Sequence, residues 1–510
     1  MKPILHQDIT TNKNSYVATA PILAGTVLLT QAALASIPLP EVRRQRCNSC
    51  LKKAPLQCCS RCISAYFCSN ECFRNAWLHF HRVLCEPQTR DLYANIDKNQ
   101  WLLERVALTL HSHAHLSKQH SHSPPYLQRA IEALEAHKKI GTDILPDNTA
   151  IETLLKQCEM SLEELGELSH LVRRTAFVIQ DPDQHLDPIA LGLYPLTSLH
   201  IPHSCQPNAG VIYKGSQQVV IAVTDISADE PITLSYVDLV STKQDRLEAL
   251  QARFGPEYVC HCARCEATDG IDYLLERCPP KDISHIPQEI KTWSVLDKVK
   301  LYSAKKSAPG TITPGHELDV PDFTHYTSHC MSPDYYLATI QHRRHPLNGF
   351  ELETREERAR FAARLEFTMQ ALSKIPELHC LNLATIRTIE GLMQQRMAES
   401  NWVEAMRCSL YLLVVYKLIF PVLHPTVTYH TLVLARASWN SLVQLELTGI
   451  GKRLERIYEN GVRMWIYVAR TSVAITFGQD TSLWREVVEL EWVFERDQKL
   501  KQQQQQHQQQ

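Results

Sequence analysis

The sequence predicts an α+β protein in which short strands, cysteine-rich segments and long helices follow one another along the chain. Residues 1–40 and 171–236 contain β-favouring runs separated by turn residues, which indicates strands. Cysteines gather between residues 47 and 85 and again between residues 260 and 265, a spacing typical of metal sites. Residues 87–170 and the chain after Arg355 instead repeat apolar residues at helical spacing.

The first 40 residues predict a pair of short strands. Residues 16–19 and 26–29 are mostly β-favouring, and Ala24-Gly25 between them marks a turn.

Residues 47–85 carry the strongest pattern in the chain, four pairs of metal-ligand residues. The pairs have the spacings C-x2-C, C-x2-C, C-x3-C and H-x3-C. Eight such ligands match two zinc ions in a small module with little core of its own. The predicted ligands are Cys47, Cys50, Cys59, Cys62, Cys68, Cys72, His81 and Cys85.

Two neighbouring residues compete with this assignment. His79 is an alternative to His81, but a helical four-residue separation places His81 and Cys85 on one face, which favours His81. Cys58 has no remaining ligand position to fill. The segment from Glu41 to Cys85 also carries eight Lys or Arg against two acidic residues, so its surface is either a solvated basic face or a contact for nucleic acid.

Residues 87–170 predict helices, with apolar residues at i, i+3 and i+4 around Trp101 and Ile151. A histidine-rich tract, residues 111–125, interrupts this pattern. We expect the tract to be a disordered loop rather than a weak metal site.

Strand patterns return at residues 171–179, 217–223 and 232–236, the last preceded by the turn Asp229-Glu230-Pro231. Cys260, Cys262 and Cys265 then form C-x-C-x2-C, which supplies three thiolates from one tight loop. A tetrahedral structural zinc ion needs a fourth ligand, and Cys205 is the predicted one.

The C-terminal half predicts a linker followed by helices. Residues 271–354 contain Pro-Pro and Pro-Gly pairs with little periodicity, which indicates a linker. Helical patterns follow at residues 402–418, 428–445 and 454–475, separated by Gly and Pro. The glutamine-rich end, residues 499–510, is expected to be disordered.

Composition limits the classes of function. The 510 residues suffice for two or three domains, and a net charge of −2 argues against general attraction to nucleic acid or membranes. The start lacks the apolar core of a signal peptide, and the longest apolar run, residues 410–420, is too short to span a bilayer. We therefore expect a cytoplasmic or nuclear protein whose 17 cysteines are reduced or bind zinc, with no membrane partner.

Several motifs carry a resemblance to a known family. His203-Ser204-Cys205-Gln206-Pro207-Asn208, the later Leu234-Ser235-Tyr236 and the C-x-C-x2-C loop resemble the core of SET-domain protein-lysine methyltransferases. Gly192-Leu193-Tyr194-Pro195 is similar to the corresponding stretch of the SET and MYND domain (SMYD) family. Residues 47–85, with Tyr66-Phe67-Cys68 and Trp77, look like a MYND zinc finger.

The resemblance implies a domain order and a metal count. It implies a split SET β-fold with an inserted MYND finger and helical insert, a zinc-binding post-SET loop and a C-terminal tetratricopeptide-like helical domain. It also implies three zinc ions, with the finger pairs interleaved so that the first and third pairs share one ion. The implied segments are residues 1–40 and 171–250 (SET), 41–86 (MYND), 87–170 (insert), 251–270 (post-SET), 271–354 (linker), 355–497 (tetratricopeptide-like) and 498–510 (tail).

The resemblance also assigns catalytic residues. Tyr236 aligns with the catalytic tyrosine of the family, and Phe177 and Tyr258 align with aromatic residues of its lysine channel, with Phe254 as an alternative to Tyr258. Methyl transfer needs a neutral amine in line with a sulfonium methyl group, and aromatic and hydroxyl groups favour that arrangement by orientation and desolvation.

The cofactor implied by the resemblance is S-adenosylmethionine (SAM). Its expected contacts are Lys13, Asn14, Ser15, His203, Ser204 and Tyr236. Two departures from the family pattern weaken this site: Lys13 and Ser15 replace glycines that let backbone approach a ligand, and Pro202 replaces an asparagine. One lost hydrogen bond to such a ligand costs roughly 1.5–3 kcal/mol.

Two functions follow. The first is a SAM-dependent protein-lysine N-methyltransferase with a degenerate cofactor site, acting on histone or non-histone proteins. The second is a catalytically silent zinc scaffold that binds protein partners through the finger and the helical domain. The finger type implies proline-rich peptides as ligands, and its basic face leaves nucleic acid as a further partner.

Overall fold

The chain forms two units, each built from several stretches of sequence. The computed structural model describes residues 4–12, 15–85, 97–118, 125–137, 141–146, 149–184, 186–266, 272, 275, 383–421, 423–447 and 452–509. One unit comprises Met1–His203, Pro207–Leu234 and Ala252–Pro256. The other comprises Ser204–Gln206, Ser235–Gln251 and Glu257–Gln510.

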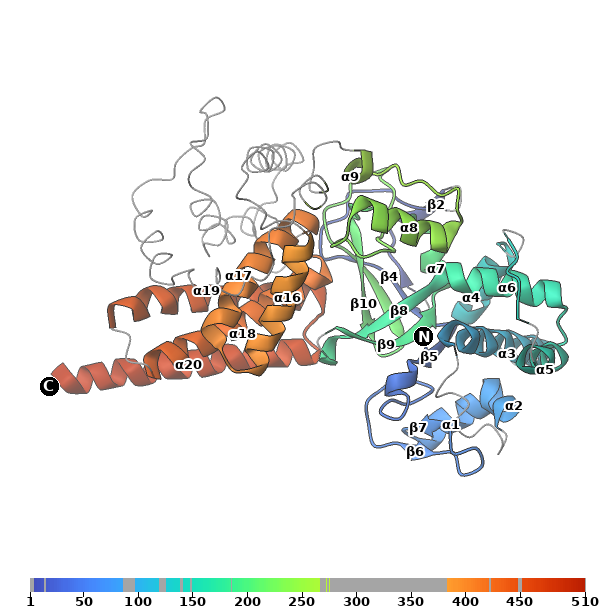
Figure 1. Cartoon of the computed structure of the whole chain (residues 1–510), viewed down its shortest axis with the longest axis horizontal. Coiled ribbons are helices and arrows are strands. Elements are labelled where there is room, and N and C mark those ends of the chain that lie inside the picture. The colour runs from blue at the N-terminus through green and yellow to red at the C-terminus, as the bar shows by residue number, and fades with distance from the viewer. Residues whose placement is uncertain are drawn as a thin grey trace. The chain divides into compact units, whose positions relative to one another are not determined.

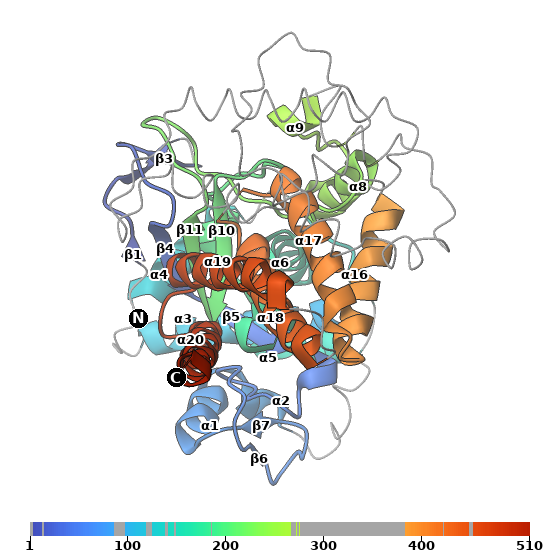
Figure 2. The same cartoon turned by 90° about the vertical axis from the view of Figure 1, so that its left-hand side faces the viewer.

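The first unit contains a four-stranded antiparallel sheet in the order β1-β4-β11-β10, of which Figure 1 labels β4 and β10 and Figure 2 labels all four strands. Leu28, Leu29, Val220 and Ile221 are buried in its two central strands, which explains why these β-branched and leucine-rich runs pair. The strands are β1 (Ile4–Leu5), β4 (Val27–Ala32), β10 (Ala209–Lys214) and β11 (Gln217–Ala222).

A second antiparallel sheet has the order β5-β9-β8 and explains the Gly192-Leu193-Tyr194 motif. Its strands are β5 (Ala35–Pro38), β8 (Ala176–Asp181) and β9 (Asp187–Leu193). Tyr194 is fully buried, and its hydroxyl donates to the Ser216 carbonyl oxygen at 2.8 Å. A Cβ atom at position 192 would lie 2.8 Å from the Tyr194 ring and 2.9 Å from Ile179, so only glycine fits there.

Two hairpins complete the strands of this unit. β2 (Ile9–Asn12) pairs with β3 (Ser15–Ala18), and β6 (Gln57–Cys58) pairs with β7 (Tyr66–Phe67). Lys13 and Asn14, predicted to contact a cofactor, lie outside the described residues. Short helical segments accompany the strands: η1 (Pro40–Val42), α1 (Asn70–Ala76), η2 (Trp77–His81), α2 (Arg82–Leu84), η6 (Pro182–Gln184) and α7 (Pro195–Ser198).

Four helices form the predicted insert: α3 (Lys98–Lys118), α4 (Pro125–Glu135), α5 (Thr149–Cys158) and α6 (Leu162–Thr175). Their shared core includes the buried Trp101, Leu102 and Val106. The expectation of a disordered histidine-rich loop is wrong for residues 111–118, which continue α3 because Leu108 and the residues before it are buried and hold the helix. Residues 119–124 lie outside the described part of the chain.

The returning strand begins later than predicted. Residues 171–175 form the last turn of α6, where Leu171 and Val172 are buried in the helical core, and β8 begins at Ala176. A capping box between Ser161 and Glu164 starts this helix.

The predicted strand at residues 232–236 does not form. The backbone N–H groups of Ile232 and Leu234 donate to the carbonyl oxygens of Tyr16 and Pro202, and the Thr233 N–H donates to the Asn208 side chain. Pro202 cannot return a hydrogen bond because it has no N–H, so a ladder cannot extend along this segment.

The second unit is mainly helical (Figure 2). Each helix from α16 to α20 packs against the next one in sequence. The helices are α8 (Lys243–Phe254), whose last three residues belong to the first unit, α9 (Ala263–Glu266), α16 (Leu383–Ala398), α17 (Trp402–Ile419), α18 (Pro425–Leu447), α19 (Lys452–Thr476) and α20 (Ser482–Gln509).

The prediction of a disordered glutamine-rich tail is wrong through Gln509, because α20 continues to that residue. Glutamine has a favourable helix propensity, and extending an existing helix avoids the unfavourable nucleation step. The predicted linker, apart from Asp272 and Leu275, and residues 355–382 of the predicted helical region lie outside the described residues. None of the described helices is long and apolar enough to cross a membrane.

Candidate functional site

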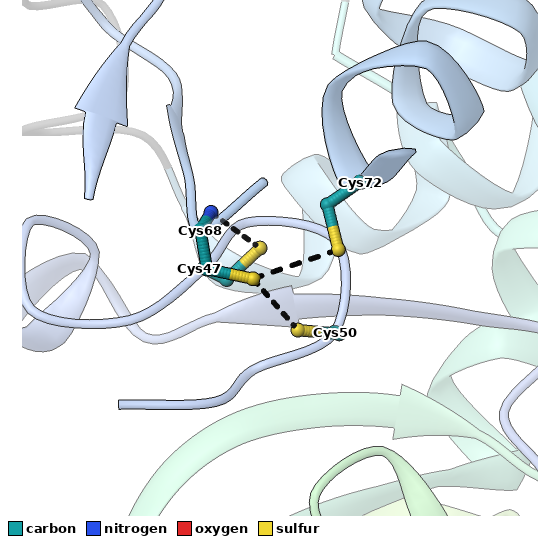
Figure 3. A group of neighbouring side chains, drawn as sticks. All are labelled: Cys47, Cys50, Cys68 and Cys72. Atoms are coloured by element: carbon teal, nitrogen blue, oxygen red, sulfur yellow. Dashed lines mark hydrogen bonds between the residues drawn. The ribbon is translucent and has the colours of Figure 1, made fainter. Parts of the chain in front are cut away.

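The first and third cysteine pairs of the finger come together in the structure. The sulfur atoms of Cys47, Cys50, Cys68 and Cys72 lie within 4.8 Å of one another, with Cys50 Sγ and Cys72 Sγ each 3.6 Å from Cys68 Sγ. Figure 3 shows Cys72 reaching the other three from its helix. The backbone N–H of Cys68 donates to Cys47 Sγ at 3.4 Å, which stabilises a thiolate.

The second and fourth pairs form another group. The ligand atoms of Cys59, Cys62, His81 and Cys85 also lie within 4.8 Å of one another, and all four residues are buried. Cys59 Sγ lies 3.6 Å from Cys85 Sγ, and His81 Nε2 lies 3.8 Å from Cys62 Sγ. His79, the alternative ligand, instead places Nδ1 3.4 Å from the Ser112 hydroxyl.

A third group, which we call the Cys205 site, consists of Cys205, Cys260, Cys262 and Cys265 and lies in the second unit. Its four sulfur atoms also lie within 4.8 Å of one another, and Cys205 Sγ lies 3.5 Å from Cys265 Sγ. Cys205 therefore lies beside the three cysteines of the C-x-C-x2-C loop, as predicted from the need of a tetrahedral zinc ion for a fourth ligand.

The donor sets of all three groups fit zinc. Thiolate and imidazole are the ligands that zinc prefers in tetrahedral structural sites. Each group supplies four protein ligands, which leaves no coordination position for water or substrate. Such sites stabilise a fold rather than catalyse a reaction.

Arg246 supports the Cys205 site in a way that the sequence did not indicate. Its side chain is 1% exposed, and its Nε–H and Nη2–H groups donate to Cys205 Sγ at 3.2 Å and Cys265 Sγ at 3.8 Å. The same guanidinium and that of Arg264 form ion pairs with Asp272 at 2.6 and 2.7 Å. Burial alone would raise the pKa of Asp272, but the hydrogen bonds and charges of both arginines outweigh it and lower that pKa.

Two arginines attach the finger to the rest of the first unit. Arg105 on α3 donates to the carbonyl oxygens of Ser36 at 3.2 Å and Asn48 at 3.1 Å, and its guanidinium lies 3.4 Å from the centre of the Phe80 ring. Arg46 forms an ion pair with Asp181 at the end of β8.

Asn208 organises the backbone around the HSCxPN motif. Its side-chain oxygen accepts from the Thr233 N–H at 2.8 Å, and its amide donates to the Pro231 carbonyl at 2.9 Å and to Glu230 at 3.1 Å. Residues 231–233 are thereby fixed beside the motif. The Leu234 N–H then donates to the Pro202 carbonyl at 3.0 Å, and His203 and Leu234 form a parallel bridge.

Two serines of the predicted cofactor site make local hydrogen bonds with the backbone. The Ser15 hydroxyl donates to the Asn12 carbonyl at 2.9 Å, and the Ser204 hydroxyl accepts from the Gln206 N–H at 3.0 Å. Pro202 is exposed, and His203 is half-buried. The neighbouring Tyr16 is buried, which raises the pKa of its phenol to about 12.

The predicted catalytic residues fall in both units. Tyr236 lies two residues beyond Leu234 and is half-buried in the second unit, together with Tyr258. Burial raises the pKa of Tyr258 to about 12, so its hydroxyl stays protonated. Phe177 lies on β8 in the first unit, where its ring centre is 6.0 Å from that of Tyr194 and 5.5 Å from the Arg253 guanidinium. The alternative residue, Phe254, lies beside the guanidinium groups of Arg174 and Arg253.

Comparisons with known proteins agree with this architecture. A sequence model of the SET domain matches residues 16–237. Histone-lysine N-methyltransferase ASHR1 of Arabidopsis thaliana is 23% identical over 433 residues, which cover 81% of this chain and 82% of the relative. Histone-lysine N-methyltransferase SMYD3 of Homo sapiens is 28% identical and N-lysine methyltransferase SMYD2-A of Danio rerio is 29% identical, over 53% and 52% of this chain.

The matches to these two animal relatives span 63% and 61% of the relatives' own length. The SET-domain match includes the cysteine-rich residues 47–85 and the HSCxPN segment, and it ends one residue after Tyr236. The chain therefore contains a SET domain, and with its three zinc-compatible ligand groups and its C-terminal helical region it is similar to the SET and MYND domain lysine methyltransferases.

Proposed function

We propose that this protein is a SAM-dependent protein-lysine N-methyltransferase. The observation that carries the proposal is the Asn208 network, which fixes residues 231–233 beside the HSCxPN motif, three residues before Tyr236 in the sequence. The relatives named above are lysine methyltransferases, and they share the SET domain to which these residues belong.

The chain's own residues would perform three tasks in such a reaction. His203, Ser204 and Tyr236, with residues 13–15, would hold SAM, which supplies an electrophilic methyl group when bound. Phe177 and Tyr258 would line the channel for the lysine side chain and exclude water, which favours the neutral amine. The Tyr236 hydroxyl would orient that amine, a contribution that depends on geometry rather than on proton transfer.

Cofactor affinity should be reduced relative to a family member with the usual asparagine at position 202. Pro202 has neither a side-chain amide nor a backbone N–H. The loss of one hydrogen bond to a charged or polar ligand group corresponds to roughly a ten- to hundredfold weaker affinity.

The direct test is a titration with SAM followed by a methyl-transfer assay on histones and a lysine peptide library. We expect SAM binding and transfer by the wild-type protein. Tyr236→Phe should bind SAM within about threefold of wild type but transfer methyl groups about a hundredfold more slowly, because one oriented hydroxyl is lost. An absence of both binding and transfer would refute the proposal.

The second candidate is a catalytically silent scaffold, and Pro202 is the observation that favours it. Replacing Pro202 with Asn, together with glycine at positions 13 and 15, distinguishes the two candidates. A large gain in SAM affinity from an undetectable starting level supports the scaffold. Tight SAM binding by the unaltered protein rejects it.

The remaining assignments are part of the same proposal. We infer that the three ligand groups hold zinc, for which metal analysis should find about three ions per chain. The segment from residue 41 to 86 would act as a MYND finger for proline-rich peptides, and the C-terminal helices as a tetratricopeptide-like wall for protein substrates. We expect the protein in the cytoplasm, the nucleus or both.

A further inference from the structure

We propose that Arg387, on helix α16, is a positioning residue for Tyr236 and acts through the turn formed by residues 238–241. This inference rests on the proposed function only for the role of Tyr236. The contacts themselves all lie within the second unit.

The turn follows Tyr236 after a single residue and is internally ordered. The Val240 N–H donates to Asp238 Oδ1 at 2.9 Å, and the Ser241 hydroxyl donates to the Asp238 carbonyl at 2.6 Å. Leu239 and Val240 are buried, at 2% and 3% exposure. A rigid turn at this place fixes the direction in which the backbone leaves Tyr236.

Two arginines from distant parts of the sequence hold the two ends of the turn. At its end, Arg246 Nη1 donates to the Ser241 carbonyl at 2.8 Å while the same guanidinium contacts the thiolates of the Cys205 site. At its start, Arg387 Nη2 donates to Asp238 Oδ2 at 2.5 Å and to the Val240 carbonyl at 2.6 Å. The turn is therefore held between the metal site and the C-terminal helices.

The Arg387 side chain is itself held in place by residues of α16 and α17. Arg387 Nη1 donates to Glu390 Oε2 at 2.9 Å, and the other oxygen of Glu390 accepts from the Tyr416 hydroxyl on α17 at 2.6 Å. Burial and the neighbouring Glu390 raise the pKa of Tyr416 above its usual range, so the phenol remains a donor. The Arg387 guanidinium binds two acceptors of the turn through Nη2 and the Glu390 carboxylate through Nη1, so it has little freedom to rotate.

The alternative is that Arg387 merely stabilises α16. Arg396, on the same helix, provides the matched control because it pairs with Glu399, just after the end of α16, at 2.5 Å and with Glu404, at the start of α17, at 2.8 Å. Removing either arginine costs the helices an ion-paired side chain. Of these two arginines of α16, Arg387 is the one with described hydrogen bonds to the turn.

The first experiment measures amide hydrogen exchange of residues 235–241 in the full-length, zinc-loaded protein without cofactor or substrate. Arg387→Ala should accelerate exchange there about five- to tenfold, because it removes a half-exposed ion pair and one hydrogen bond to a carbonyl. Arg387→Lys should restore part of the protection, and Arg396→Ala should leave these amides unchanged. Equal exchange in Arg387→Ala and wild type would overturn the proposal.

The second experiment measures methyl transfer. Arg387→Ala should lower kcat about three- to tenfold while the KM for SAM stays within twofold, since the tyrosine is displaced rather than the cofactor contacts. A parallel change in kcat and KM, or an equal loss in Arg396→Ala, would contradict positioning. If wild-type protein transfers no methyl groups, the proposed function fails, and the exchange experiment still decides whether Arg387 fixes the residues around Tyr236.

Discussion

The finger and the Cys205 site hold the same kind of ligands by different means. All eight finger ligands lie between residues 47 and 85, and the rings of Phe67, Phe73 and His81 pack against one another around them. The Cys205 site instead joins Cys205 to a loop that ends 60 residues later. A buried guanidinium donates to two of its four thiolates.

The comparison shows how the negative charge of a thiolate metal site is compensated when one ligand is distant in sequence. Four thiolates and one zinc ion carry a net charge of about −2, which is unfavourable inside a protein unless a cation lies nearby. Arg246 supplies that cation at the Cys205 site. Local sequence spacing does not supply it, so the site depends on residues outside its own motif.

The largest expected effect is the loss of zinc from the Cys205 site alone, with the finger unchanged. Cys205→Ser should reduce the zinc content by about one ion and open the loop at residues 257–266, because structural zinc contributes of the order of 10 kcal/mol to such folds. The finger should keep its two ions. Metal analysis combined with limited proteolysis checks this prediction, and an unchanged zinc content would show that the Cys205 site holds no metal.

Substitution of Arg246 should have the next largest effect. Arg246→Met preserves the length of the side chain but leaves Asp272 with Arg264 as its remaining described ion-pair partner, and breaking a buried pair costs about 3–5 kcal/mol. We expect a chelator to remove one zinc ion much faster than from wild type. Chelation kinetics with a colorimetric zinc reporter measure this. Faster loss of the finger ions would contradict the separation of the two regions.

A pH effect is expected near the finger. Burial raises the pKa of Glu104, which precedes Arg105 on α3, to about 7. Because this pKa is higher in the folded protein than in the unfolded chain, the folded state loses stability as pH rises from about 4.5 to about 7, by up to about 3 kcal/mol. Glu104→Gln should therefore stabilise the protein at pH 8 but not at pH 4.5. Thermal unfolding at both pH values tests this, and an equal shift at both would exclude titration of Glu104 as the cause.

The smallest effect concerns the attachment of the finger. Arg105→Lys retains the charge but loses the planar group that contacts two carbonyl oxygens and the Phe80 ring, which costs about 1–2 kcal/mol. We expect unchanged zinc content and a lower midpoint of denaturant unfolding. Arg74→Lys, at an exposed position of the finger, is the matched control. An equal loss in both variants would argue against a specific role of Arg105.

The groups of metal ligands could be predicted because their information is local. Spacings such as C-x2-C place two sulfurs on one turn, and only Cys205 required the chemical argument that three thiolates need a fourth. The long helices α17, α18 and α19 were predicted for the same reason, since their apolar spacing is a local property.

The wrong prediction of a strand at residues 232–236 arose because distant contacts decide the structure there. Residues 232–236 have a strand composition, but their backbone groups bond to Tyr16, Pro202 and Asn208, which are far away in sequence. Nothing in the sequence around Arg246 marks it as a partner of thiolates. The predictions for Lys13 and Asn14 fall outside the described residues, so the cofactor role of this loop remains a prediction.

The division of the chain around Cys205 has a consequence for its synthesis. Ser204–Gln206 belongs to the second unit although the residues on both sides belong to the first. On the ribosome this thiol emerges well before Cys260, Cys262 and Cys265, and it must stay reduced and unligated until they follow. A fragment that stops before residue 260 would thus contain Cys205 without the three cysteines that complete its ligand group.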